Sequence, residues 1–358
     1  MKILIIGAGA SGITAGHILE EKGIEFEILE ASAVHGGRLK KIEGFADFPI
    51  DLGAEWVHKW IKANPPLTES ILDETNSEFE TFKYRPKTYS LWKFGRLWNV
   101  NFIRFFFSAL DDHKFVAATW FDFFDQLVTP SLQAHIHYNQ PVNKIEYGGE
   151  KVVVTTTSER KYEADKLLIT VPITILQREF ITFDPPLPAE KIAAFNKEEM
   201  PDGLKIFIRF SEKFYPDFLF IDSIFYNITH GYGYYDATLG KNSSYHVLGF
   251  LGDGDRVKFL AKLENDEEII QTVLAELDEI FDGKASKYYL NHIVQNWSQA
   301  PFIQGTYSHR KGDVATLSAP VGEQLFFAGE AMNSKGNTIA VHGASESAYL
   351  ALERMLGS

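Results

Sequence analysis

The first thirty residues carry the pattern that most constrains the fold of this chain. An apolar strand at 2–6 leads into a glycine-rich turn, a helix at about 11–22 and a second strand at 25–29. The turn reads G-x-G-x-x-G, through Gly7, Gly9 and Gly12. Strand, glycine turn, helix and strand in this order form a βαβ unit, which predicts a Rossmann-like α/β fold.

The glycine turn is suited to holding a pyrophosphate. Gly7 makes the tight turn, Gly9 lets the backbone approach the phosphates, and Gly12 lets the helix pack closely on the strand. The phosphates would lie at the helix N-terminus beside Ser11, where unpaired N–H groups and the helix dipole favour negative charge. Glu30 ends the second strand, where a carboxylate accepts hydrogen bonds from the ribose hydroxyls of an adenosine. The sequence therefore predicts a dinucleotide-binding domain.

Three later segments contain glycine junctions that a nicotinamide cofactor does not need. The segment HGGR places Gly37 and Arg38 just beyond the ribose-binding acid, where the arginine can pair with the pyrophosphate. The other two segments are DLGAEWVH and EQLFFAGEAMN. In the latter, an apolar strand runs into Gly329 and Glu330, which predicts that a second backbone segment approaches the cofactor.

These motifs, with GLKIFIRFSEKFYP, WSQAPFIQGTYS and AVHGASESA, occur in the order and approximate spacing of the flavin-containing amine oxidases. The chain resembles the monoamine and polyamine oxidases over nearly its whole length, and least between about 60 and 135, where those enzymes carry a longer helical insertion. The resemblance implies FAD, bound in a glutathione-reductase-type domain interleaved with an α+β substrate domain. It also implies oxidation of a primary or secondary amine, polyamines included, to an imine and an aldehyde, with oxygen reduced to hydrogen peroxide.

The resemblance assigns roles to three candidate catalytic residues. Lys205 begins the strand GLKIFIRF, where the family has a lysine that hydrogen-bonds a water touching flavin N5. Tyr307 matches one wall of the aromatic pair beside the substrate nitrogen, but the other wall is Ala340 here. His58 resembles the histidine that faces the substrate in animal polyamine oxidases, although Lys59 replaces the usual glycine after it. Without the resemblance, a solvated Lys205 and a structural His58 explain the same pattern.

The remaining candidates are cofactor-binding residues. By resemblance, Trp297 and Glu330 contact the flavin. Val142 meets the adenine through its backbone, and Val341 lies near the pyrimidine end of the flavin. The segment DLGAEWVH supplies Gly53, Ala54, Glu55 and Trp56. Thr306 stands where covalently flavinylated members have cysteine, so we expect non-covalent FAD.

Composition limits the partners. The 358 residues carry a formal charge of −13, which argues against a nucleic-acid or anionic-membrane surface and favours a cationic small molecule. The chain has no cysteine, so thiolate metal sites are excluded, and HIH at 135–137 has no evident third ligand. We therefore expect no metal, and a small-molecule amine and oxygen as partners.

Two segments bear on the location of the protein. A strand that starts at residue 2 leaves no room for a leader peptide, so a cytoplasmic location is expected. The apolar stretch NFIRFFFSAL at 101–110 is too short to span a bilayer and is interpreted as a core or lid helix. The oligomeric state is left open by the sequence.

The predicted FAD-binding domain is discontinuous and comprises 1–58, 135–180 and 296–358. The substrate-binding domain takes 59–134, interpreted as a shortened helical part, and 181–295, interpreted as sheet-rich.

Three functional classes compete. The favoured class is an amine oxidase. A related flavin desaturase or porphyrinogen-type oxidase is the second, and Lys205 argues against it. A non-catalytic FAD-binding scaffold is the third, suggested by the shortened helical part and by Ala340. An amino-acid oxidase is disfavoured, since the carboxylate-binding arginine of those relatives would lie near Trp56.

Overall fold

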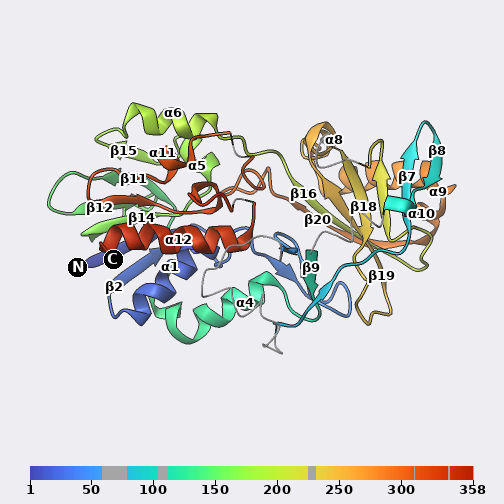
Figure 1. The fold of residues 1–358 in the computed structure, drawn as a ribbon, viewed down its shortest axis with the longest axis horizontal. Helices are drawn as coiled ribbons and strands as arrows, with labels where there is room; N and C mark the ends of the chain where they lie inside the picture. Colours follow the sequence, from blue (N-terminus) through green and yellow to red (C-terminus); the bar gives the residue numbers. More distant parts are fainter. Residues whose placement is uncertain (59–78, 104–111, 225–230, 310, 338, 358) are drawn as a thin grey trace.

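The computed structural model describes residues 1–58, 79–103, 112–224, 231–309, 311–337 and 339–357. These residues form two lobes side by side, with both ends of the chain on the same lobe (Figure 1). The first lobe is built on a parallel sheet, and the second on a larger mixed sheet. None of the described helices is long and apolar enough to cross a membrane.

The parallel sheet of the first lobe has the strand order β10-β2-β1-β14-β21. Its strands are β1 (Lys2–Ile6), β2 (Glu25–Leu29), β10 (Ile136–His137), β14 (Lys166–Ile169) and β21 (Leu325–Phe327). Ile3 and Ile5 of β1 enter one buried cluster, and Leu4 and Ile6 enter another. Since successive side chains of a strand point to opposite faces, the sheet is covered on both sides.

Helices cover the first face of this sheet. They are α1 (Ala10–Glu21), α4 (Trp120–Leu127) and α12 (Val341–Leu356). α1 packs against both α4 and α12, and α12 lies beside α1 in Figure 1. The side chains of Thr14 and Ser345 share a hydrogen bond of 2.9 Å across the α1–α12 contact. The predicted βαβ unit is thus confirmed.

A second, mostly antiparallel sheet covers the opposite face, in the order β13-β12-β11-β15. Its strands are β11 (Val142–Glu146), β12 (Val152–Thr156), β13 (Lys161–Ala164) and β15 (Thr182–Asp184). Three short helices join the same buried cluster: α5 (Ile173–Gln177), α6 (Ala189–Lys197) and α11 (Val314–Ser318). The domain boundaries stay a prediction. Because β15 and α6 pack with the first lobe, we propose that the boundary after residue 180 falls after α6.

The sheet of the second lobe has the order β20-β16-β19-β18-β17-β7-β8. Its strands are β7 (Tyr89–Lys93), β8 (Arg96–Asn99), β16 (Leu204–Phe210), β17 (Phe218–Ile221), β18 (Tyr232–Asp236), β19 (His246–Gly252) and β20 (Tyr289–Asn296). Helices α8 (Gly254–Leu260), α9 (Asp266–Phe281) and α10 (Lys284–Tyr288) belong to the same lobe (Figure 1). α9 buries its apolar stripe on one face of the sheet.

The prediction of a helical part within 59–134 is wrong for most of its described residues. β7 and β8 form a hairpin that extends the large sheet, and its turn lies at Phe94 and Gly95, which have positive φ angles of 55° and 67°. Residues 104–111, which include most of the interpreted lid helix, lie outside the described residues, as does Lys59. The sequence does not indicate this hairpin, because a two-residue hairpin turn with positive φ angles usually contains asparagine, aspartate or glycine, and phenylalanine is uncommon there.

Short elements join the two lobes. Two small sheets contain β3 (Lys41–Ile42) with β4 (Ile50–Asp51), and β5 (Val57–His58) with β9 (Asp112–Phe115) and β6 (Thr81–Lys83). Single turns of other helix types lie at Asn101–Ile103, Val128–Leu132, Gln133–His135 and Glu330–Met332. The DLGAEWVH segment runs from the second residue of β4 to the end of β5, and it leads from the first lobe towards β16.

Candidate active site

The glycine turn between β1 and α1 is closely packed. Gly7 has a φ of +102°, and a Cβ atom on Gly12 would lie 1.9 Å from the Gly7 carbonyl oxygen, so neither position accepts a larger residue. Gly9 precedes α1 and has no side chain with which to cap the first N–H groups, and Ser11 is buried in the first turn. These donors and the positive end of the helix dipole fit a pyrophosphate.

Glu30 and the HGGR segment lie against this turn. Glu30 is buried, and its Oε2 atom accepts a hydrogen bond of 2.7 Å from the N–H of Ala8. The N–H of Gly36 donates to the Ala8 carbonyl at 2.7 Å. A Cβ atom on Gly37 would lie 3.6 Å from the Cα atom of Gly9. The structure therefore brings the predicted ribose and phosphate candidates together at one turn.

A second group of candidates gathers around Arg38. Its Nη1 atom pairs with Glu330 at 3.0 Å and donates to the Thr306 carbonyl at 2.5 Å. Glu330 is buried and also accepts a hydrogen bond of 2.8 Å from the Ser308 hydroxyl. Three segments that are far apart in the sequence thus meet at one guanidinium group.

The DLGAEWVH segment joins the same group. A Cβ atom on Gly53 would lie 1.8 Å from the Arg38 carbonyl oxygen, and the N–H of Ala54 donates to that oxygen at 3.2 Å. The indole N–H of Trp297 donates to the Leu52 carbonyl at 2.8 Å. The structure therefore brings four predicted cofactor-binding residues, Arg38, Gly53, Ala54 and Trp297, into one wall.

Three further cofactor candidates belong to the first lobe. Gly329 has a φ of +140°, and its N–H donates to the Ser347 hydroxyl of α12 at 2.8 Å. Val341 is the first residue of α12 and is buried. Val142 is half-buried at the start of β11. Contacts of these residues with a bound cofactor stay a prediction.

Lys205 is not a solvated lysine at the head of a strand. Its side chain is 14% exposed, and its Nζ atom lies 2.5 Å from Glu55 Oε2. The Tyr235 hydroxyl donates to the same oxygen at 2.5 Å. β16 is buried on both faces, because Ile206 and Ile208 enter one core cluster and Phe207 enters another. The interpretation of Lys205 as a solvated residue is thus wrong.

Sequence reasoning missed Lys114 of β9, the second partner of Glu55. Its Nζ atom lies 2.6 Å from Glu55 Oε1, and its side chain is 2% exposed. Burial lowers the pKa of Lys114 to about 8, against the attraction of Glu55. Burial also opposes ionisation of Glu55, but the Lys114 and Lys205 ammonium groups hold the pKa of Glu55 well below its usual range. Glu55 is therefore a fixed anion.

His58 and Tyr307 belong to other contacts. His58 Nδ1 lies 2.6 Å from Asp112 Oδ1, in the pair of strands β5 and β9. Its neighbour His342 is buried, and burial together with His58 lowers the pKa of His342 to about 4. The Tyr307 ring lies 5.7 Å from that of His309 and is 38% exposed. The catalytic roles of His58 and Tyr307 stay predictions.

HIH at 135–137 is not arranged as a metal pair. The His135 ring stacks on Phe26 at 4.5 Å, and His137 Nε2 lies 3.3 Å from a Glu27 oxygen. Over the ranges that the structure describes, no group of three or more His, Cys, Asp or Glu side chains is placed to hold a metal ion.

Comparison with known proteins identifies the family. Residues 122–356 match the flavin containing amine oxidoreductases, and residues 5–75 match the NAD(P)-binding Rossmann-like domain. The first match spans more than half of the chain, so the protein belongs to the flavin containing amine oxidoreductase family. FAD is its cofactor, and the glycine turn and the wall around Arg38 fit such a dinucleotide.

Individual relatives agree with this assignment. The human protein "Lysine-specific histone demethylase 2" is 26% identical over 417 residues, which cover 92% of this chain and 50% of the relative. This chain thus spans about half the length of that protein. "Polyamine oxidase 7" of Oryza sativa subsp. japonica is 25% identical over 444 residues, covering 96% of this chain and 92% of the relative.

Solved structures share the fold. Cyclohexylamine oxidase from Brevibacterium oxydans IH-35A superposes with a TM-score of 0.79 at 17% identity, covering 100% of this chain and 99% of the other. Wild-type putrescine oxidase bound to putrescine gives a TM-score of 0.78 at 16% identity and covers 100% of both chains. The predicted fold class is confirmed.

Proposed function

We propose that the protein oxidises a small primary or secondary amine to an imine, with FAD as the redox group. The amine carbon next to nitrogen loses two electrons and a proton, and nitrogen loses a second proton. Oxygen takes up the two electrons and two protons and becomes hydrogen peroxide. Water then converts the imine to an aldehyde and releases the nitrogen as ammonia, or as a primary amine when the substrate is a secondary amine. When bound, FAD accepts the two electrons.

The cytoplasmic location stays a prediction.

The observation that carries this proposal is the pairing of Lys205 with Glu55, two residues after the predicted cofactor-binding residue Gly53. Lys205 is a desolvated donor held in one place by a carboxylate and by the Tyr235 hydroxyl next to it. Such a donor is suited to holding the water that hydrolyses the imine. Because the two ammonium groups hold the pKa of Glu55 well below its usual range, Glu55 is a weak base; it orients Lys205 and is not the group that takes a proton from the substrate.

An oxygen-consumption screen tests the proposed reaction. Amines should consume oxygen and yield peroxide and aldehyde, while amino acids and porphyrinogens should not. Oxygen uptake with porphyrinogens alone would favour the desaturase-type alternative. No uptake with any compound, in protein that carries FAD, would favour the scaffold alternative.

We expect the purified protein to be yellow and to release intact FAD on acid or heat denaturation. The chain has no cysteine to form a thioether, and Thr306 occupies the expected attachment position. Absorbance of the supernatant after precipitation measures the released flavin. Flavin that stays with the precipitated chain would contradict non-covalent binding.

A further inference from the structure

The Lys114 ammonium lies inside a box of three aromatic rings. Its Nζ atom is 4.3 Å from the ring centre of Trp56, 4.6 Å from that of Tyr84 and 4.1 Å from that of Tyr235. Glu55 adds a carboxylate at 2.6 Å. Aromatic faces around a desolvated cation are the arrangement by which proteins recognise ammonium ligands. In this protein the cation inside the aromatic box is the side chain of Lys114 and not a ligand.

The rings of this box are held by contacts that do not involve Lys114. Trp56 meets Tyr84 edge to face, with ring centres 5.1 Å apart and planes at 84°. The Trp56 carbonyl accepts a hydrogen bond of 3.2 Å from Trp120, and the Tyr235 hydroxyl is bound to Glu55. Each ring of the box therefore has an anchor besides its contact with Lys114.

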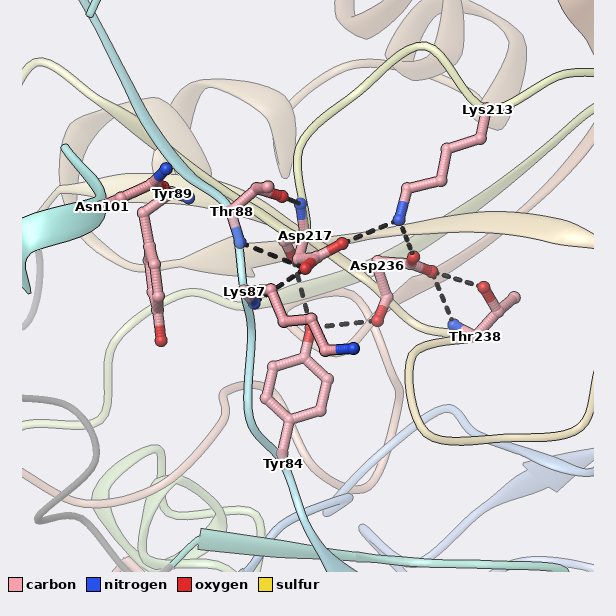
Figure 2. Close-up of polar contacts among 9 residues, drawn as sticks. All are labelled: Tyr84, Lys87, Thr88, Tyr89, Asn101, Lys213, Asp217, Asp236 and Thr238. Atoms are coloured by element: carbon pink, nitrogen blue, oxygen red, sulfur yellow. Dashed lines mark hydrogen bonds and ion pairs between the residues drawn. The ribbon is translucent and has the colours of Figure 1, made fainter. Parts of the chain in front are cut away.

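Tyr84 has its own anchor in the second lobe. Its hydroxyl donates to the carbonyl oxygens of Asp217 and Asp236, at 3.3 Å and 3.0 Å. Figure 2 shows Lys213 between the carboxylates of these two residues, 2.8 Å from Asp217 and 2.6 Å from Asp236. Asp217 also accepts hydrogen bonds from the N–H groups of Lys87 and Thr88, beside β7. The network ties Tyr84 to strands β17 and β18.

The charge around the box is unfavourable for a second ammonium group. Lys114 and Lys205 share the single carboxylate of Glu55, and Lys241 lines the same small cavity as Glu55 and Asp51. Burial and the charge of Glu55 raise the pKa of Asp51 well above its usual range, which removes negative charge. The cavity holds about 10 Å³, room for one water at most.

We propose that Lys114 determines specificity, by occupying the aromatic box as a resident cation and so excluding substrates that carry a second positive charge. The inference rests on the proposed amine oxidation and names its substrate class, which is monoamines with an apolar remainder. It reverses the preference for cationic substrates that the net charge of −13 suggests, because the local charge beside Lys205 is positive.

Isosteric pairs of amines test this proposal. Each pair compares an alkylamine with a terminal diamine of equal heavy-atom number, from butylamine against diaminopropane to nonylamine against diaminooctane. In the wild type, kcat/KM should favour the monoamine about tenfold or more at each length that is oxidised, since like charges repel strongly at a desolvated site. Lys114→Met keeps the stem and frees the box, so the preference should fall to about twofold or reverse.

Two control variants separate occupancy of the box from general charge. Lys114→Arg keeps a cation in the box and should keep the preference. Lys241→Met removes a cation beside the box but leaves Lys114 in place, so it should also keep the preference. Where Lys114→Met does not fold, Lys114→Gln removes the charge and can still donate to Glu55.

The outcomes are distinct. Equal losses for both members of every pair would show that Lys114 only braces Glu55, and would overturn the proposal. A wild-type preference for diamines would overturn it as well. If no amine is oxidised, the proposed function has failed, and binding of the amines to the protein then tests the role of Lys114 instead. The monoamine must then raise the melting temperature of the FAD-loaded wild type more than its diamine, and Lys114→Met must remove that difference. Equal shifts would overturn the proposal.

Discussion

Replacing Lys205 by methionine should slow amine oxidation by about 100-fold to 10,000-fold while the protein keeps its fold and its FAD. Methionine nearly preserves the apolar stem, so the loss of packing is small. Glu55 retains Lys114 and the Tyr235 hydroxyl as partners, so no buried carboxylate is left alone. Stopped-flow absorbance measures flavin reduction and reoxidation separately and shows which half-reaction needs the lysine.

Arg209→Met is the matched control for this variant. Arg209 lies on the same face of β16, four residues further on, and its guanidinium donates to the Phe45 carbonyl. Both half-reactions should change by less than about twofold in this variant. Equal rates for Lys205→Met and the wild type, in folded and FAD-loaded protein, would remove Lys205 from the reaction.

Replacing Glu55 by glutamine should lower the free energy of unfolding by about 3 to 5 kcal/mol at neutral pH. The glutamate side chain is 10% exposed and is the carboxylate shared by the Lys114 and Lys205 ammonium groups. Glutamine keeps the volume but leaves both cations without a counter-ion. Urea unfolding of the FAD-loaded proteins, fitted with a common slope, measures the loss.

The loss caused by Glu55→Gln should shrink as the pH rises. The pKa of Lys114 is already lowered to about 8, and removal of Glu55 lowers it further. Between that pKa and the ordinary value for lysine, the unfolded chain binds more protons than the folded one, so stability rises with pH. Unfolding curves at pH 7 and at about pH 9.5 test this. A loss that is equal at both pH values would show that the cluster is not held by charge.

Much of the first lobe could be predicted because its signals are local. The glycine turn, Glu30 and the strands on either side follow from residue spacing alone, and they lie where expected. In the second lobe, α9 carries the same kind of local signal, since its buried residues repeat at helical spacing and Asn265 caps its first turn. The pairing of β16 with β19 and β20 was not visible in the same way, because it joins distant segments.

The box around Lys114 could not be predicted. Lys114 follows His113 in a short polar-looking segment, and an isolated lysine is ordinarily exposed. Its burial depends on Glu55, Tyr84 and Tyr235, which come from three other parts of the chain. The resemblance to amine oxidases indicated Lys205 and Glu55 as candidate residues. It did not indicate Lys114, the second cation that pairs with Glu55.

Anaerobic titration of the FAD-loaded protein with an alkylamine measures amine oxidation at the flavin itself. We expect the flavin absorbance to bleach without oxygen, and admitting air to restore the colour with one hydrogen peroxide for each reduced flavin. The aldehyde should appear in equal amount. A flavin that stays oxidised with every amine tried, in protein that keeps its FAD, would contradict amine oxidation as the function of this chain.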